Sequence, residues 1–179
     1  MKKLTALLIA ILLTGCIKAP KGLERDDVSL PSLDKLVAED YACQCKQARF
    51  GGKILSVTAL PGKMKLEILS LPLVSLSAKP MLSAESNGRF IAYLEGFIDP
   101  ERLKEQFITV KGILKKQETG KIDQVDYHYP VLEANHYKVW QLVPEYYYEP
   151  EDLADWRESR RMGWGPFWRP EPRLRYVLQ

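Results

Sequence analysis

The side chains with the most distinctive chemistry are cysteines and histidines. Cys43 and Cys45 stand one residue apart in "YACQCKQ", which allows three alternatives: a small, strained local disulfide, two free thiols, or two metal ligands. A metal site would need further ligands, and the two histidines of the sequence, His128 and His136, flank Glu133 in "HYPVLEANH". That spacing matches no known zinc motif, so we expect no bound metal.

The sequence contains no pattern that is typical of an enzyme. Its serines lie in no nucleophile elbow, and its scattered carboxylates define no pair across a cleft. The glycines of "RFGGK" do not stand between a strand and a helix, as a phosphate-binding loop requires. We therefore expect a protein without catalytic activity and without a cofactor.

Cys16 has a different chemistry because of where it stands. Lys2 and Lys3 precede the apolar run Leu4–Leu13. This run is too short for a transmembrane helix of about 20 residues, but it suits a signal peptide, which needs about 7–15. It ends in "LTGC", an order that resembles the lipobox of bacterial lipoproteins. We predict that residues 1–15 are a cleaved signal peptide, and that Cys16 carries a diacylglycerol and further acyl chains such as palmitate, which hold it in membrane lipids.

The residues that follow Cys16 indicate a compartment. They are Ile17 and Lys18. An aspartate directly after the acylated cysteine tends to retain a lipoprotein in the inner membrane, and neither residue is an aspartate. We therefore expect the periplasmic face of the outer membrane, an oxidising compartment that permits a disulfide between Cys43 and Cys45. Loss of two lysines from a net charge of +3 leaves a nearly neutral chain, so we expect no nucleic-acid partner.

Residues 16–40 form the lipidated N-terminus and a flexible tether, because proline, glycine and mixed charge occur there without a period. A short helix capped by Ser32 is expected within "PSLDKLVAED". The next strand candidate, "QARFGGKILSVTAL", contains Gly51-Gly52, which indicates a bulge or a sharp bend of the kind found at a barrel corner.

Further strand candidates are "MKLEILSLPL" and "RFIAYLEGF", in which apolar residues alternate with others, and a loop separates the two. A short helix over "DPERLKEQF" follows, capped by Asp99. Two more strands are expected in "ITVKGILKKQETGKI", with a turn at Thr119-Gly120, and in "YPVLEANHYKVWQLV". Three strands, a helix and two strands is the order of the OB-fold, so we predict a mostly β, OB-like five-stranded barrel over residues 41–145.

Residues 146–179 have a different composition. "PEDLADWRESRRMG" predicts a helix with early acids and late arginines, and the three prolines of "WGPFWRPEP" predict an irregular tail beyond it. Six arginines are offset by seven acidic residues between Glu145 and Gln179, which argues against a strongly basic lipid-binding face. The tail aromatics could fold back on the barrel, reach a membrane interface or dock a partner.

Several segments together resemble one family. "QARFGGKI", "GRFIAYLEGFIDPERL", "ITVKG", "TGKI" and "YHYPVLEANHYKVW", in this order behind a lipobox, are similar to the Slp family of starvation-inducible outer membrane lipoproteins of Gram-negative bacteria. The resemblance runs from about residue 47 to 143, and Cys43 and Cys45 are not part of its pattern. It implies an outer membrane lipoprotein linked to stationary phase or stress, and it supplies no reaction.

Two functional hypotheses follow. The first is a non-catalytic envelope protein that acts through contacts with envelope proteins, membrane lipids or lipopolysaccharide. The alternative is an OB-type module that binds a cell-wall sugar or peptide. An open apolar groove beside Tyr93 and Trp140 would favour ligand binding, whereas a barrel face covered by the tail would favour the contact function. A redox role for the cysteine pair has no further support.

Overall fold

The structure is a computed structural model, and it describes residues 18–25, 28–42, 45–163 and 169–179. The predicted signal peptide, Cys16 and Cys43 lie outside these residues. The chain divides into two compact units, Met1–Val139 and Trp140–Gln179, which we describe separately. The division falls at the end of the last barrel strand, a few residues before the boundary that the composition indicated.

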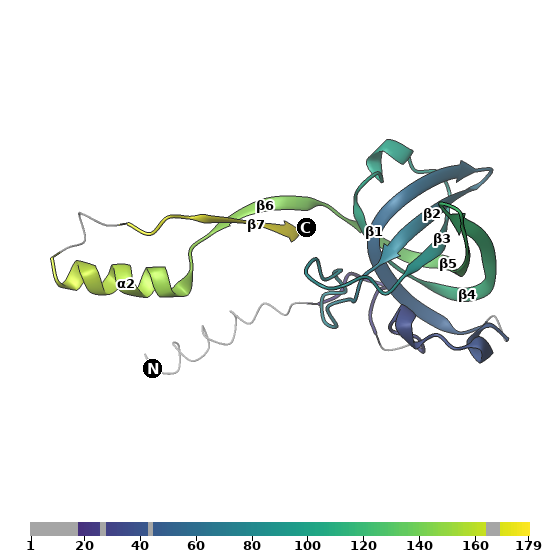
Figure 1. Cartoon of the computed structure of the whole chain (residues 1–179), viewed down its shortest axis with the longest axis horizontal. Helices are drawn as coiled ribbons and strands as arrows, with labels where there is room; N and C mark the ends of the chain where they lie inside the picture. The colour runs from purple at the N-terminus through teal and green to yellow at the C-terminus, as the bar shows by residue number, and fades with distance from the viewer. Residues whose placement is uncertain (1–17, 26–27, 43–44, 164–168) are drawn as a thin grey trace, which may run out of the picture. The chain divides into compact units, whose positions relative to one another are not determined.

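The first unit is a closed barrel of five strands (Figure 1). They are β1 (Gln47–Leu60), β2 (Lys63–Ser70), β3 (Arg89–Glu95), β4 (Phe107–Ile122) and β5 (Val125–Trp140). Around the barrel they follow the order β1-β2-β3-β5-β4. The sheet is mixed, because β1 pairs antiparallel with β2 and β4 whereas β3 and β5 run parallel. The five strands expected from the sequence are thus confirmed.

Alternation along the strands separates the core from the outer face. On β2, Met64, Leu66 and Ile68 are fully buried in the barrel core. Phe90 on β3 joins them and packs edge-on against Phe50 of β1, with 5.5 Å between ring centroids. Side chains point to opposite faces at successive positions of a strand. The intervening residues of β2 and β3 therefore lie on the outer face of the barrel.

The glycine pair of β1 stands where this strand changes partner. Gly52 pairs with Ser70 of β2 and also with Ile108 of β4. A Cβ atom on Gly52 would lie 1.8 Å from the carbonyl oxygen of Leu69, so only glycine permits this approach of two backbones. The expected bend is therefore at a barrel corner, while the irregularity in strand register lies slightly later, between residues 54 and 56.

Two connections differ from the sequence prediction. The helix expected over "DPERLKEQF" is a single 3-10 turn, Pro100–Arg102, although the Asp99 side chain caps it by accepting a hydrogen bond from the Glu101 amide at 3.0 Å. The turn expected at Thr119-Gly120 is wrong, because both residues continue β4 and the chain reverses at residues 123–124. Asp123 takes a φ of 52° there, which aspartate tolerates better than most residues.

The segment before β1 packs against the barrel over its described residues. Leu30 and Leu33 are buried with the core residues, and Leu30 forms a parallel bridge with Ala48. Two 3-10 turns, Leu33–Lys35 and Ala38–Tyr41, replace the helix expected in "PSLDKLVAED". This segment therefore differs from the free tether that its composition indicated, because its few leucines are enough to attach it.

The second unit contains β6 (Leu142–Tyr147), α2 (Pro150–Arg161) and β7 (Arg173–Leu178). β6 and β7 pair antiparallel as a two-stranded sheet, and α2 lies between them in the chain (Figure 1). The helix predicted over "PEDLADWRESRRMG" is confirmed. Residues 164–168 of "WGPFWRPEP", the segment predicted to be irregular, lie outside the described part of the chain. The following "RLRYVL", for which the sequence predicted no strand, forms β7 and pairs with β6.

Candidate functional site

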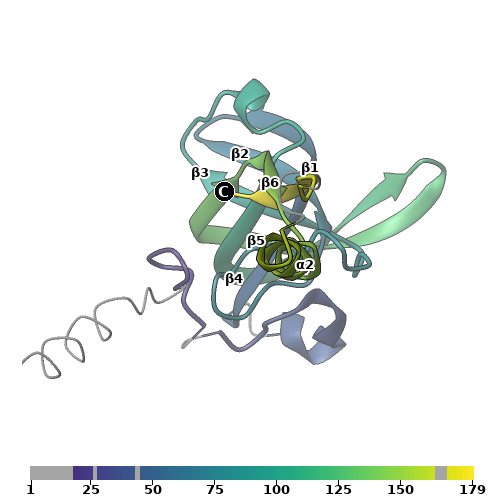
Figure 2. The same ribbon diagram turned by 90° about the vertical axis from the view of Figure 1, so that its left-hand side faces the viewer.

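The last two barrel strands are longer than the barrel needs. β1 pairs with β4 only as far as Ile113, and the pairing of β3 with β5 begins at Val131. Residues 114–130 therefore extend past these pairings as a two-stranded arm, seen in light green toward its tip in Figure 2. Tyr127 and Tyr129 of the arm pack with Ile91 of β3 in a small apolar cluster on the outer face of the barrel.

An open pocket of about 200 Å³ lies between the arm and the outer face of β1, β2 and β3. Most of its lining side chains are polar or charged. The lining residues are Ser56, Thr58, Lys65, Glu67, Ile91, Glu118, Thr119, Gly120, Lys121 and Tyr129. The pocket therefore combines three strands of the barrel with a segment that is distant in sequence.

Glu118 is the centre of the first polar cluster and ties the arm to β2 and β3. Its Oε2 atom lies 2.6 Å from the Lys65 Nζ atom, and its Oε1 atom accepts a hydrogen bond from the Tyr93 hydroxyl, also at 2.6 Å. The ammonium group of Lys63 stands over the Tyr93 ring, 4.4 Å from its centroid. Both carboxylate oxygens of Glu118 are thus occupied by donors from neighbouring strands.

These contacts fix the ionisation of the cluster. Burial alone would raise the pKa of Glu118, but the hydrogen bonds from Lys65 and Tyr93 outweigh it and lower the pKa below its ordinary value. Burial and the adjacent carboxylate raise the pKa of Tyr93, so its hydroxyl stays a donor. The hydrogen bond to Glu118 raises the pKa of Lys65. Glu118 is therefore an ionised binding group and not a proton donor at neutral pH.

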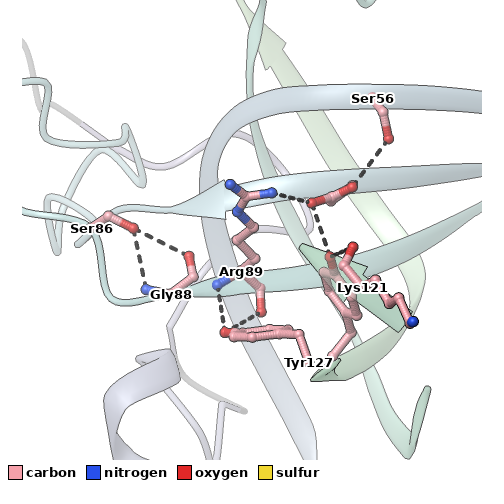
Figure 3. Close-up of polar contacts among 8 residues, drawn as sticks. Ser56, Ser86, Gly88, Arg89, Lys121 and Tyr127 are labelled. Atoms are coloured by element: carbon pink, nitrogen blue, oxygen red, sulfur yellow. Dashed lines mark hydrogen bonds and ion pairs between the residues drawn. The ribbon is translucent and has the colours of Figure 1, made fainter. Parts of the chain in front are cut away.

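Glu67 is the centre of the second polar cluster, drawn in Figure 3. Arg89 and Ser56 point toward the same carboxylate: the Arg89 Nη1 atom lies 2.8 Å from Glu67 Oε1, and the Ser56 hydroxyl lies 3.5 Å from Oε2. The Tyr129 hydroxyl is 3.3 Å from Oε1 and 3.4 Å from the Lys121 carbonyl oxygen. This cluster thus connects β1, β2, β3 and both strands of the arm.

The surroundings of Arg89 hold it in place from two sides. The hydrogen bond to Glu67 raises the pKa of Arg89, and burial, followed by the charge of Glu67, raises the pKa of Tyr129. The Tyr127 hydroxyl accepts a hydrogen bond from the Arg89 amide at 3.0 Å (Figure 3). Just before Arg89 in the chain, the Ser86 hydroxyl contacts both the amide and the carbonyl group of Gly88, each at 3.2 Å. The guanidinium is therefore a fixed part of the site.

The two clusters share one design. In each, a glutamate pairs with one cation and lies within hydrogen-bonding reach of one tyrosine hydroxyl. Their opposite charges balance, while hydroxyl groups from Ser56, Thr58 and Thr119 also face the pocket. Such a surface offers many donors and acceptors, and Lys121, which also lines the pocket, adds a positive charge outside the two clusters. Its chemistry suits a neutral polar ligand and is not arranged for proton transfer.

The structure does not bring together the residues considered as metal ligands. His128 contacts Thr119 on the arm, with 3.2 Å between Nδ1 and Oγ1, and Glu133 pairs with Lys115 at 2.9 Å. His136 is 3.3 Å from the Asn135 side chain. Within the described ranges, no three histidine, cysteine or acidic side chains form a metal-binding group.

The cysteines and aromatic residues considered above have different outcomes. Cys45 is disulfide-bonded, but its expected partner Cys43 lies outside the described residues, so their pairing stays a prediction. Tyr93 joins the Glu118 cluster, whereas Trp140 belongs to the second unit and does not line the pocket. The pocket is lined mostly by polar side chains and by neither of these two residues, so it is not the open apolar groove that would favour ligand binding.

The sequence alone does not predict four of the site residues, Glu67, Arg89, Glu118 and Tyr129. The alternation of β2 gave a partial signal, because it placed Lys65 and Glu67 on the face opposite the core. Their partners become visible only from strand register and from the position of the arm.

Among the described residues, no helix has the length and apolarity needed to cross a bilayer.

The comparisons with known proteins agree on one family. The family model of the outer membrane lipoprotein Slp family matches residues 13–174. An uncharacterized protein of Haemophilus influenzae is 46% identical over 172 residues, which cover 93% of this chain and 91% of that protein. None of the solved structures shows a significant similarity.

Two Escherichia coli proteins are also similar. The uncharacterized lipoprotein YeaY is 32% identical over 87% of this chain and 80% of its own length. The outer membrane protein Slp is 32% identical over 92% of this chain and 84% of its own length. With a family model that spans most of the sequence, the chain belongs to the outer membrane lipoprotein Slp family.

Proposed function

We propose that this chain is a non-catalytic protein of the stationary-phase or stressed cell envelope that acts by binding. Acylated Cys16 anchors it in the lipids of the outer membrane, on the periplasmic face. The "LTGC" motif that ends at Cys16 and the family both support this anchor. Its barrel is of the OB type. The strand order and the short 3-10 helix between β3 and β4 support this assignment.

The observation that carries the proposal is the polar pocket between the arm and strands β1 to β3, with its two ion-paired glutamates. OB-folds use this face of the barrel, with its adjoining loops, to bind oligosaccharides and oligonucleotides. A periplasmic address and a nearly neutral chain leave the saccharide as the suitable ligand. Glutamates held by cations and tyrosines are well placed to share hydrogen bonds with sugar hydroxyls.

A cell-wall saccharide fits this pocket better than a cell-wall peptide. The charged termini and side chains of a peptide would need counter-charges of both signs, whereas Glu118 and Glu67 are already paired with Lys65 and Arg89, which leaves Lys121 as the lining charge outside these pairs. A neutral glycan segment needs only donors and acceptors, which Thr58, Thr119 and the clusters provide. We therefore assign the neutral glycan part of the cell wall as the ligand class.

Titration of the isotopically labelled protein with N-acetylglucosamine oligomers tests this proposal by NMR. Amide shifts should change in β2, β3 and the arm, and Glu67→Gln should weaken the response. Glu133→Gln is the matched control, because Glu133 pairs with Lys115 and does not line the pocket. Wild-type protein that responds to a stem peptide but not to the glycan, or to neither, would refute the assignment.

A second candidate function is contact with envelope proteins, lipids or lipopolysaccharide. It is favoured by the exposed aromatic side chains of the second unit, where Tyr146 and Tyr176 are 71% and 58% exposed. Crosslinking in native envelopes, comparing the full chain with one truncated before Trp164, tests for such partners. Identical adducts from both chains would place the contact outside the tail.

A further inference from the structure

The register of β6 and β7 sorts their side chains by polarity. Six apolar residues form three cross-strand pairs on one face, which we call the apolar hairpin face: Leu142 with Leu178, Pro144 with Tyr176, and Tyr146 with Leu174. Alternation places Glu145, Tyr147, Arg173 and Arg175, with Val143 and Val177, on the opposite face. The two-stranded sheet is therefore amphipathic.

Most of the apolar hairpin face is uncovered. The exposed fractions are 71% for Tyr146, 58% for Tyr176, 49% for Leu174 and 43% for Leu142, and Leu178 is buried. Helix α2 does not bury these side chains. Contiguous exposed apolar residues on one face mark an interaction surface more often than single exposed residues do.

The charged side chains of this unit are engaged away from that face. The Arg175 guanidinium lies 2.7 Å from the Glu145 carboxylate, and it stands over the Tyr147 ring at 4.7 Å from the centroid. Arg173 contacts Glu149 and Asp152, each at 3.3 Å. These ion pairs join β7 to β6 and to the start of α2, so the charged and the apolar residues of the two strands lie on different faces.

We propose that the apolar hairpin face docks on the lipid bilayer. This surface is separate from the pocket of the barrel and does not depend on the function proposed for it. Three observations select a bilayer as the occupant: the size of the face, its residue types and the membership of the chain in an outer membrane lipoprotein family.

The size of the face argues against a stable protein partner. With fully exposed aromatic side chains contributing about 150–250 Å² each, the face offers roughly 500 Å². A stable protein interface buries about 800 Å² on each partner. A chain already held at a membrane needs much less surface, because anchoring raises the effective concentration of lipid at every other contact.

The residue types also fit an interface between lipid and water. Tyrosine is enriched at the headgroup level of membranes, where its ring is buried and its hydroxyl stays hydrated. Tyr146 and Tyr176 on the face are accompanied by leucine and proline and by no charged residue. From Glu145 to Gln179, six arginines are offset by seven acids, so docking should not require anionic lipid.

Photocrosslinking of the full chain in native outer membranes tests this docking. Photoreactive benzoylphenylalanine replaces Tyr146 or Tyr176 on the apolar hairpin face. The matched controls are Tyr147 and Arg175, which neighbour them in sequence and lie on the opposite face of the same strands. We expect phospholipid adducts from positions 146 and 176, and no lipid adducts from positions 147 and 175.

Other outcomes would overturn the inference. An adduct with a second copy of the chain, an adduct with another protein, equal lipid adducts from both faces or no adduct would each do so. Yields in vesicles of neutral phosphatidylcholine should equal those with added phosphatidylglycerol, and a requirement for the anionic lipid would contradict an apolar contact. Glu67→Gln should leave the adducts unchanged, which separates this surface from the pocket.

Discussion

Replacing Glu118 by glutamine should destabilise the barrel in a way that depends on pH. The substitution removes the charge that pairs with Lys65 and accepts from Tyr93. The side chains of Lys65 and Glu118 are 34% and 36% exposed, so solvent screening limits the ion pair to about 0.5–1 kcal/mol. The Tyr93 hydrogen bond adds about 1 kcal/mol, giving about 1.5–2 kcal/mol at pH 7.

The sign of the pH dependence follows from the lowered pKa of Glu118. A group whose pKa is lower in the folded than in the unfolded state stabilises the fold above the unfolded value, and this contribution is lost as pH falls through the folded value. The difference between wild type and Glu118→Gln should therefore be fully present above the ordinary glutamate pKa of 4.5 and should shrink at more acidic pH. At that point the wild-type carboxyl is protonated and, like glutamine, uncharged.

Urea denaturation at neutral and acidic pH is the assay. All four tryptophans, at positions 140, 156, 164 and 168, and helix α2 belong to the second unit, so amide NMR signals of β2 and β3 should follow the barrel while tryptophan fluorescence follows the second unit. Glu133→Gln is the control and should cost about 0.5 kcal/mol or less. The reasoning would be refuted by an equal loss in both variants, or by a Glu118→Gln loss that persists undiminished in acid.

Three other predictions concern the core, the barrel corner and the anchor. Leu66→Ala should cost about 2.7–5 kcal/mol in thermal unfolding, since the side chain is fully buried, and a loss below about 1 kcal/mol would contradict that packing. Gly52→Ala should prevent the normal approach of β1 to the Leu69 carbonyl, and an unchanged amide NMR spectrum would refute this. Cys16→Ser should abolish metabolic palmitate labelling and release the chain from the membrane fraction, and retention of both would contradict lipidation there.

The strands and the core face could be predicted because they depend on local patterns. Met64, Leu66 and Ile68 alternate with Lys65 and Glu67, and this period alone identifies both the strand and its buried side. The Asp99 cap and the helix of the second unit have equally local signals. The lengths of short helices and the position of the β4–β5 turn depend on tertiary packing, so the sequence placed them less well.

The site depended on information that is not local. Glu118 meets Lys65 and Tyr93 only because the arm returns over β2 and β3. Arg89 and Tyr129 reach Glu67 from strands that are joined by the parallel pairing of β3 and β5. In the same way, β7 could not be predicted from "RLRYVL" alone, because its partner β6 is separated from it by a helix and a proline-rich segment.

The extension of β4 and β5 beyond the barrel has an evolutionary consequence. The barrel closes through residues before Leu114 and after Pro130, so changes near the tip at residues 123–124 do not disturb its strand pairing. Exposed turns tolerate insertions and substitutions far better than the elements that they connect. Under the proposed function, substitutions in this one hairpin therefore alter what the pocket binds and leave the strand pairing of the barrel intact.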